Sequence, residues 1–337
     1  MSFLQPTDHL IIMDLWYEPR TNARCLTPPE LQQLRTTGAG VILNFVNWRK
    51  IETAAGVYDW SFYDQLVEAY RTAGFRTLLM VYDEAPEWFP PDWYLTFQDG
   101  TIAKRVEGAG ACGWSMLSPW NEEAQSVART FINLCRFHYD APDVQCIAGF
   151  GKEGESLLIP GAHAWFDPAA KASWRLWCLQ HDFKGQETDL ASPALLPPVK
   201  EWLTASMVAY ALNHHSLYRE PWTCLHRAFP EDAGCFNDAI YTALNQPLWG
   251  IQWTYMSFKD VEIGKRTRRD KDTYQIKMWG GAEWVEGLRP HTPIAIAHGL
   301  QGLIVGPIHP YSGHDKIEDW MLEAMTWSLA QWPQGAS

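Results

Sequence analysis

Gly40-Val-Ile-Leu-Asn-Phe-Val-Asn-Trp48 is a nearly unbroken apolar run, and it decides the fold class. Such a strand is typical of a parallel sheet that is covered on both faces. A helical pattern follows from Phe62 to Ala73, with Ser61 as its predicted N-cap and Gly74 as its stop. A second apolar run then extends from Phe75 to Tyr82. Strand, helix and strand in this order predict a βαβ unit of a parallel sheet.

The same alternation continues along the chain and predicts eight strands. The first crossover helix is predicted from Pro28 to Thr37, between the N-cap Thr27 and the stop residue Gly38. Eight strands favour a (β/α)8 TIM barrel over an open sheet, and we expect one barrel domain to span residues 1–337. The predicted strands are 9–16, 40–48, 75–82, 144–151, 222–229, 248–255, 273–279 and 302–308. The other predicted helices are 121–139, 169–180, 198–218, 237–244, 292–301 and 316–331.

Two long connections interrupt this alternation, one after the third strand and one after the fourth. Residues 83–119 are rich in proline, glycine and aromatic residues and show no periodicity, and residues 156–196 form a second irregular excursion around one helix. Loops of this length inside a compact domain are usually functional. In a barrel they would lie at the carboxyl ends of the strands, where active sites of this fold are built.

The overall composition excludes two classes of partner. The formal net charge is −12, so the chain has no electrostatic footprint for nucleic-acid phosphates. The basic residues between Lys259 and Lys271 alternate with acidic ones, which favours a solvated connection over a binding patch. No apolar stretch approaches the roughly 18 residues that a membrane span needs. We therefore expect neither a nucleic-acid partner nor a membrane span.

Cysteine usage favours a reducing compartment. The seven cysteines are an odd number without a CxxC spacing, and the sequence has no Asn-x-Ser/Thr sequon. Residues 1–9 lack a basic region followed by an apolar core, so we expect no signal peptide. The expected location is the cytoplasm, while export of a mature form stays open.

Two glutamates are the candidate catalytic residues. Glu155 ends the segment Cys146-Ile-Ala-Gly-Phe-Gly-Lys-Glu-Gly-Glu155, and Glu283 ends Tyr274-Gln-Ile-Lys-Met-Trp-Gly-Gly-Ala-Glu283. They follow the predicted fourth and seventh strands, whose carboxyl ends would open onto one face of a barrel. Paired carboxylates in a cleft rich in tryptophan are typical of glycosidic bond cleavage. The apolar neighbours of Glu155 would raise its pKa and suit it to a general acid, with Glu283 as nucleophile or base.

Other acidic residues and one glycine motif compete for this interpretation. Glu153 would point the same way as Glu155 in an extended chain and could help to keep one carboxyl protonated, whereas Glu286 is typical of surface charge. Gly149-Phe-Gly151-Lys-Glu-Gly154 matches the dinucleotide pattern GxGxxG. It occurs in mid-chain and no helix start follows it, so glycines crowded around a pocket are the favoured explanation.

Aromatic residues are unusually frequent, with 19 tryptophans in 337 residues. Flat rings at a pocket mouth suit the apolar faces of sugars, although some of these rings must belong to the core. Arg49, Glu84 and Glu87 are further candidates for the rim. The predicted contacts to substrate are Trp16, Asn47, Trp48, Asp83, Trp88, Glu153, His226, Trp253, Tyr255, Trp279 and His309.

Two local resemblances to known enzyme families support a carbohydrate substrate. Asn47-Trp-Arg-Lys-Ile-Glu52, Gly56-Val-Tyr-Asp-Trp60, Asp64, Gly74-Phe-Arg-Thr-Leu-Leu79 and Ala85-Pro-Glu-Trp88 resemble the N-terminal barrel half of family-42 and family-35 β-galactosidases. Those families belong to clan A of the glycoside hydrolases. The resemblance implies a retaining mechanism with Glu155 as acid/base and Glu283 as nucleophile.

The second resemblance implies the other stereochemical outcome. Gly149-x-Gly151-x-x-Gly154-Glu155-x-x-x-x-Pro160 is similar to the segment that holds the general acid of β-amylases, which invert. Clan A enzymes usually have Asn just before the acid/base, and here that residue is Gly154. The sequence therefore leaves retention and inversion open, with retention preferred.

Two further functions stay open at this point. A barrel that binds carbohydrate without catalysis would show the same aromatic residues. A metal-dependent hydrolase could use Glu155, His226, Glu283 and His309, although no HExxH motif is present. The preferred interpretation is a glycosidase that needs neither a metal nor another cofactor.

Overall fold

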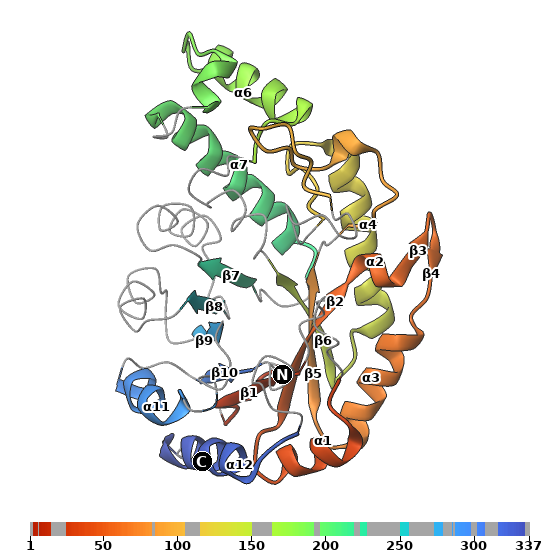
Figure 1. Cartoon of the computed structure of the whole chain (residues 1–337), viewed down its shortest axis with the longest axis vertical. Coiled ribbons are helices and arrows are strands. Elements are labelled where there is room, and N and C mark those ends of the chain that lie inside the picture. Colours follow the sequence, from red (N-terminus) through yellow and green to blue (C-terminus); the bar gives the residue numbers. More distant parts are fainter. Residues whose placement is uncertain are drawn as a thin grey trace.

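A computed structural model gives the arrangement of most of the chain (Figure 1). It describes residues 3–5, 7–14, 25–82, 85–104, 115–149, 164–191, 196–218, 223–227, 250–255, 273–278, 285, 287–297, 302–306 and 316–333. For residues 223–227, 250–255 and 273–278 it describes only the backbone.

The described strands close into a parallel barrel, which confirms the predicted (β/α)8 fold. Around the barrel the order is β1, β2, β5, β6, β7, β8, β9 and β10, and β10 pairs with β1. Each strand lies within the segment predicted for it. The strands are β1 (Leu10–Met13), β2 (Val41–Asn47), β5 (Arg76–Tyr82), β6 (Val144–Gly149), β7 (Thr223–Arg227), β8 (Gly250–Tyr255), β9 (Thr273–Met278) and β10 (Leu303–Val305).

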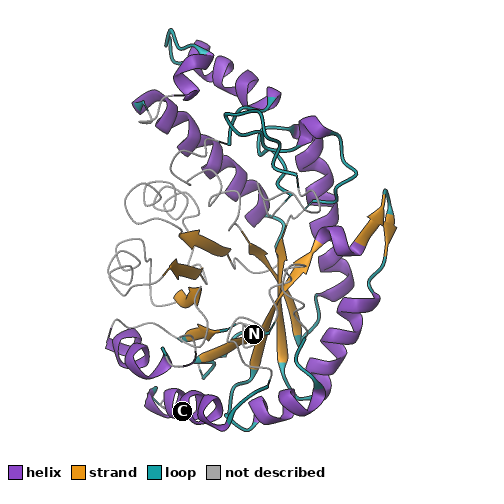
Figure 2. Ribbon diagram, in the orientation of Figure 1, coloured by secondary structure: helices purple, strands orange, loops and turns teal. Residues whose placement is uncertain are grey.

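Helices cover the outside of the barrel, as Figure 2 shows for α12, α1, α3 and α4. In chain order the described α-helices are α1 (Pro28–Arg35), α2 (Trp48–Ile51), α3 (Ser61–Thr72), α4 (Glu122–Tyr139), α6 (Pro168–Gln180), α7 (Pro197–His215), α11 (Leu288–Ala297) and α12 (Asp319–Gln331). Two short 3₁₀ helices, η1 (Pro91–Trp93) and η2 (Glu187–Ala191), lie in the long connections. A hairpin of β3 (Glu52–Ala54) and β4 (Val57–Tyr58) follows α2.

The structure corrects some predicted boundaries. α11 begins at Leu288 rather than at residue 292, because Pro290 is tolerated in a first helical turn, where the backbone N–H has no intrahelical partner. Ser61 is the first helical residue of α3 rather than its N-cap, and its backbone N–H donates to the Asp59 carboxylate at 3.0 Å. α2 and the hairpin were not predicted. The predicted helix 237–244 lies outside the described residues.

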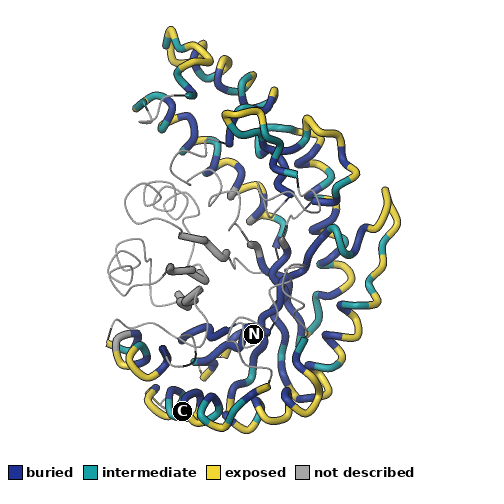
Figure 3. The backbone as a smooth tube through the Cα atoms, in the orientation of Figure 1, coloured by how far each residue is buried: buried dark blue, intermediate teal, exposed yellow. Residues whose placement is uncertain are grey.

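The core has two layers because successive residues of a strand point to opposite faces. In β2, Ile42 and Val46 face outward and join the cluster that contains Leu66 and Tyr70 of α3. Phe45 belongs to the other face of the strand and is buried inside the barrel. Figure 3 shows this gradient, with buried strands within and exposed helix surfaces outside.

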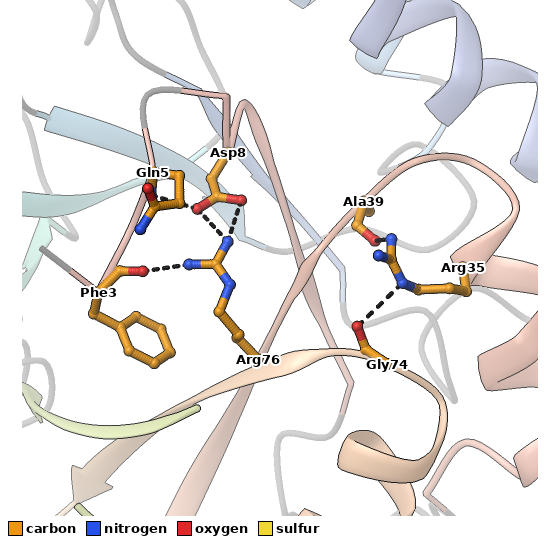
Figure 4. A network of polar contacts seen from close by, with 7 residues as sticks. All are labelled: Phe3, Gln5, Asp8, Arg35, Ala39, Gly74 and Arg76. Carbon is orange, nitrogen blue, oxygen red and sulfur yellow. Dashed lines mark hydrogen bonds and ion pairs between the residues drawn. The ribbon is translucent and has the colours of Figure 1, made fainter. Parts of the chain in front are cut away.

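A network of polar contacts ties the N-terminal segment under the barrel (Figure 4). Arg76 begins β5, and its Nη2 lies 2.6 Å from each carboxylate oxygen of Asp8. The same guanidinium donates to the carbonyl of Phe3. Nearby, Arg35 donates to the carbonyls of Gly74 and Ala39, at 3.1 and 2.6 Å. Both arginines therefore act at the amino ends of the strands, opposite the expected site.

Candidate functional site

The carboxyl ends of the barrel strands are the candidate active-site face. β6 and β9 are the fourth and seventh barrel strands, as predicted, and all barrel strands run parallel. The chains that leave these two strands therefore start on the same face. Glu155 and Glu283 follow them but lie outside the described residues, as do Trp16, Asp83, Glu153, Trp279 and His309.

The backbone of three predicted contact residues is described. His226 is the last residue but one of β7 and is in register with Trp253 of β8. Tyr255 ends β8 and is in register with Met278, the last residue of β9. These positions lie in the carboxyl halves of neighbouring strands, on the side of the barrel where the expected acids follow.

Asn47 ends β2 at the same face. The residue is buried and is in register with Tyr82, the last residue of β5. Its backbone N–H donates to the hydroxyl of Tyr63 at 2.8 Å, and that hydroxyl donates to the carbonyl of Phe45 at 3.0 Å. α3 therefore fixes the point where β2 ends.

Trp48 is not a pocket residue, which corrects the prediction of a substrate contact. The chain turns into α2 after Asn47, so the Trp48 side chain enters the layer between strands and helices and is fully buried. Its ring stacks on Phe131 with centroids 4.8 Å apart and meets Phe89 edge-on at 5.2 Å. Its Nε1 donates to the Glu52 carboxylate at 2.6 Å. Core packing thus uses this ring completely.

Trp88 is available to a ligand, in contrast to Trp48. It lies in the connection after β5. Among the described tryptophans it alone is exposed, with 42% of its surface accessible to solvent. Its ring packs at a tilt on Phe89, with centroids 4.3 Å apart. A partly exposed aromatic ring suits the apolar face of a sugar.

An ion pair joins the connections that follow β2 and β5. Nη1 of Arg49 in α2 lies 2.7 Å from Oε1 of Glu87. The Arg49 side chain is 17% exposed and that of Glu87 is 39% exposed. The pair places a partly desolvated cation and a carboxylate beside Trp88.

The two long connections pack on each other instead of lying separately over the barrel. The first connection folds back on itself, since Tyr94 pairs with Leu117 in an antiparallel bridge. The second connection joins it there, because the backbone N–H of Phe166 donates to the carbonyl of Thr96 at 2.9 Å. The indole of Trp120 donates to Ser206 of α7 at 2.9 Å. With α6 and the start of α7 they form a lobe that stands beyond the barrel strands (Figure 1).

A buried aspartate joins the two connections inside this lobe. Oδ1 of Asp167 accepts hydrogen bonds from the hydroxyl of Ser118 and the backbone N–H of Ala170, both at 2.9 Å, and so caps α6. Burial raises the pKa of the Asp167 carboxyl, and these hydrogen bonds oppose the shift only in part.

Asp14 is a buried carboxylate that sequence reasoning missed. It follows β1, accepts from the hydroxyl of Tyr70, and accepts from the backbone N–H of Leu26 at 3.1 Å. Asn44 donates to the Tyr70 hydroxyl at 2.9 Å. The available signal was an acidic residue inside the otherwise apolar run predicted as the first strand, because such a group is buried only with partners. The network fixes the two ends of the connection between β1 and α1.

The described residues contain no group of three or more His, Cys, Asp and Glu side chains that could hold a metal ion. The residues of the predicted metal alternative lie outside them, or, for His226, have only a described backbone. Within the same part of the chain, no helix is both long and apolar enough to cross a membrane.

Solved structures with the same fold give the comparison. The β-amylase catalytic domain from Paenibacillus polymyxa is 11% identical, with a TM-score of 0.63, over 96% of this chain and 99% of that one. The β-galactosidase from the psychrophilic Marinomonas ef1 is 12% identical, with a TM-score of 0.62 over 96% of this chain. The β-galactosidase from the Antarctic haloarchaeon Halorubrum lacusprofundi is 13% identical, with a TM-score of 0.61 over 94%.

The comparison covers the barrel and not the whole of every neighbour. The chain spans 59% and 57% of the two β-galactosidase chains. No protein-family model and no curated protein sequence matches it. At this level of identity the likeness shows the fold, and the fold agrees with both resemblances drawn from the sequence.

Proposed function

We propose that this chain is a glycoside hydrolase that cleaves an O-glycosidic bond at the carboxyl ends of its barrel strands. The observation that carries the proposal is the likeness of nearly the whole chain to the barrels of a β-amylase and two β-galactosidases. The order of the strands supports it, since Glu155 and Glu283 follow the fourth and seventh strands of a closed parallel barrel. The proposed substrate is a carbohydrate.

In the proposed mechanism the two glutamates divide the work. Glu155 protonates the glycosidic oxygen as the aglycone leaves, and Glu283 attacks the anomeric carbon to form a covalent glycosyl-enzyme. Glu155, now ionised, then removes a proton from the water that breaks this intermediate, and the product keeps the configuration of the substrate. Asn47, Trp88, His226, Trp253 and Tyr255 are the proposed sugar contacts with a described backbone.

Inversion is the alternative stereochemistry, and the β-amylase neighbour and Gly154 favour it. Glu283 would then activate a water molecule on the opposite face of the sugar. Retaining sites hold their carboxyl groups about 5–5.5 Å apart and inverting sites about 6.5–9.5 Å apart. NMR of the first anomer formed from an aryl glycoside distinguishes the two mechanisms directly.

The test of catalysis is a screen of 4-nitrophenyl glycosides followed by isosteric variants. Glu283→Gln should lower kcat about 10³-fold or more, because an amide can neither attack nor act as a base. Glu286→Gln is the matched control, since it lies three positions away and is expected to be surface charge. Undiminished turnover by Glu283→Gln would remove this residue from the mechanism.

Glu155→Gln has a more specific signature. It should lose most activity on substrates with poor leaving groups. It should keep much more on 2,4-dinitrophenyl glycosides, because 2,4-dinitrophenolate departs as a stable anion and needs no proton from the acid. Equal losses on both kinds of substrate would argue against an acid role.

The same screen decides between the remaining functions. Loss of activity on treatment with a chelator, restored by divalent metal, would support the metal-dependent hydrolase. Sugar binding by the parent without hydrolysis of any glycoside would support a non-catalytic carbohydrate-binding barrel.

A further inference from the structure

We propose that the Arg49–Glu87 ion pair positions Trp88 as a sugar platform at the rim of the proposed site, and that the substrate is an oligosaccharide with one sugar on this platform. The inference rests on the proposed function and specifies its substrate class. Three features of the described residues carry it: the location of the ion pair, the anchoring of its two segments, and the exposure of Trp88.

The ion pair lies at the same end of the barrel as the expected acids. β2 and β5 are neighbours, and the register that pairs Asn47 with Tyr82 ends both strands level with each other. Arg49 lies in the helical turn directly after β2, and Glu87 lies in the connection after β5. The 2.7 Å contact between them bridges the two connections at this rim.

Both partners stand on anchored segments. Beneath Arg49, the ring of Trp48 is buried and donates to Glu52 at 2.6 Å. The Glu52 carboxylate also accepts from the backbone N–H of Gly56 at 2.9 Å, in the turn of the β3–β4 hairpin. α2 therefore cannot shift without disturbing buried contacts, and it offers the guanidinium from a fixed position.

The segment that carries Glu87 is held on both sides. The backbone N–H of Ala85 donates to the carbonyl of Ser115 at 3.1 Å, and the Tyr94 hydroxyl donates to the carbonyl of Pro86. Phe89 is buried against Trp48, with ring centroids 5.2 Å apart. The backbone on either side of Trp88 is thus fixed by buried partners.

Trp88 itself stays open in this rigid frame. Its ring contacts Phe89 at a tilt, while 42% of the residue is exposed. Leaving a large apolar ring in water is unfavourable, and a rigid, partly exposed aromatic side chain is typical of a contact that a partner covers. A sugar ring offers a flat apolar face to such a platform.

The proposal assigns Trp88 to a second sugar of the substrate. Trp88 stands on the connection after the third strand, whereas the proposed acids follow the fourth and seventh. Trp48, on the neighbouring connection, is fully buried and cannot extend the platform. In this proposal one sugar binds between the two acids and a further sugar binds on Trp88, and the dependence of KM on substrate length tests that assignment.

The test compares substrates of different length in the intact chain. The probes are the 4-nitrophenyl monoglycoside that the parent hydrolyses best and oligosaccharides of two to five units, from the α-1,4-glucose and the β-1,4-galactose series. Trp88→Ala should raise KM for the longest oligosaccharide about tenfold more than KM for the monoglycoside, because one aromatic contact contributes about 1.4 kcal/mol, which is tenfold in affinity.

The positioning role is tested through both partners of the ion pair. Arg49→Met and Glu87→Gln should each raise the same KM ratio about threefold to tenfold, and the exchanged pair Arg49→Glu with Glu87→Arg should recover at least half of the loss. A purely structural role would lower the thermal midpoint without changing this ratio. Phe137→Ala is the matched control, since Phe137 is a 91% exposed aromatic residue on α4 and has no expected contact with the ligand.

Failure of this inference differs from failure of the proposed function. If the parent cleaves the monoglycoside but has the same KM ratio as Trp88→Ala, Trp88 is not a sugar platform. The proposal that the chain is a glycosidase would still stand. A parent that hydrolyses no probe contradicts the glycosidase. In that case calorimetry with both pentasaccharides decides: binding that Trp88→Ala weakens supports the platform, and binding equal in both proteins, or absent from both, overturns it.

Discussion

The hydroxyl of Tyr70 donates a hydrogen bond to a carboxylate, whereas the hydroxyl of Tyr63 on the same helix donates one to a backbone carbonyl. Both tyrosines are buried on α3, and the acceptor of Tyr70 is Asp14. Burial, and then the charge of Asp14, raise the pKa of Tyr70 well above its usual range, so this hydroxyl stays protonated and remains a donor. The two residues therefore provide a matched comparison of a charged and a neutral acceptor.

Tyr70→Phe should destabilise the fold more than Tyr63→Phe. Removing the donor leaves the buried Asp14 carboxylate with fewer partners, which is expected to cost about 2–3 kcal/mol, against about 1–2 kcal/mol for the two neutral hydrogen bonds of the Tyr63 hydroxyl. Urea unfolding followed by circular dichroism measures both variants. Equal losses would mean that the charge of Asp14 contributes nothing to this network.

Asp167 gives the stability a pH dependence of known sign. Burial raises its folded-state pKa above the unfolded value of about 3.9, so the folded state binds the proton more tightly. Its contribution to stability is complete below the unfolded pKa and is lost as the pH rises through the folded pKa. Asp167→Asn should therefore become progressively more favourable, relative to the parent, as the pH rises from about 4 towards neutrality.

Asp143 supplies the opposite sign and serves as the control for Asp167. The hydrogen bond from Arg71 lowers the pKa of Asp143, and the two groups are 2.6 Å apart on the surface. Its stabilisation is present above the unfolded pKa and is lost as the pH falls through the folded pKa, and solvent screening keeps it small. Between about pH 3 and pH 7, the difference in urea midpoint between variant and parent should rise with pH for Asp167→Asn and fall with pH for Asp143→Asn. Parallel trends would contradict both assignments.

At the scale of elements, local sequence signals determine where the first helices begin and end. The carboxylate of Glu30 accepts from the backbone N–H and the hydroxyl of Thr27, at 2.8 and 2.7 Å, at the start of α1. Beyond the helix ends, Gly38 and Gly74 have φ values of 97° and 85°, which favour glycine. These signals depend on neighbours only, and for that reason the sequence predicts them.

The α1 cap can be tested separately from the core. Thr27→Ala removes the hydroxyl that holds Glu30 and should cost about 1 kcal/mol of unfolding free energy. Thr36→Ala is the control, since Thr36 lies at the other end of α1 and its hydroxyl donates to the Gln33 carbonyl in an exposed position. A smaller loss for Thr27→Ala than for Thr36→Ala would show that Glu30 does not stabilise the start of α1.

Other elements depend on contacts that sequence patterns do not contain. The eight strands were predictable because strands covered on both faces are apolar runs, whereas the hairpin after α2 is short and only its first residue, Glu52, is buried. Trp48 was assigned to the pocket because a tryptophan after a strand suits a platform or a core equally. The helical turn after Asn47, which no local signal marks, decides between the two. The lobe joins connections that are far apart in sequence, so local sequence patterns could not predict its packing either.

At the scale of the whole molecule, closure of the barrel brings the candidate residues to one end. The strands before Glu155 and Glu283 are not neighbours, since β7 and β8 lie between them on one side. Only a ring in which all strands run parallel presents both carboxyl ends at one mouth. Residues that stabilise the opposite end of the barrel therefore support the site without contacting it.

The ion pair between Arg76 and Asp8 lies at the amino ends of the strands. Removing it tests whether stability at that end of the barrel affects activity at the other end. Arg76→Met leaves the Asp8 carboxylate, which is only 7% exposed, without its ion-pair partner at 2.6 Å. Arg76 retains some solvent contact, so the expected loss is about 2 kcal/mol, below the range for a fully buried pair. Hydrogen exchange should accelerate in β1, which follows the tied segment directly, while kcat on the best glycoside at 25 °C stays unchanged. Arg35→Met is the control, because the described acceptors of Arg35 are backbone carbonyls rather than a carboxylate, so its loss should destabilise the chain less. A fall in kcat for Arg76→Met without unfolding would show that the two ends of the barrel are energetically coupled.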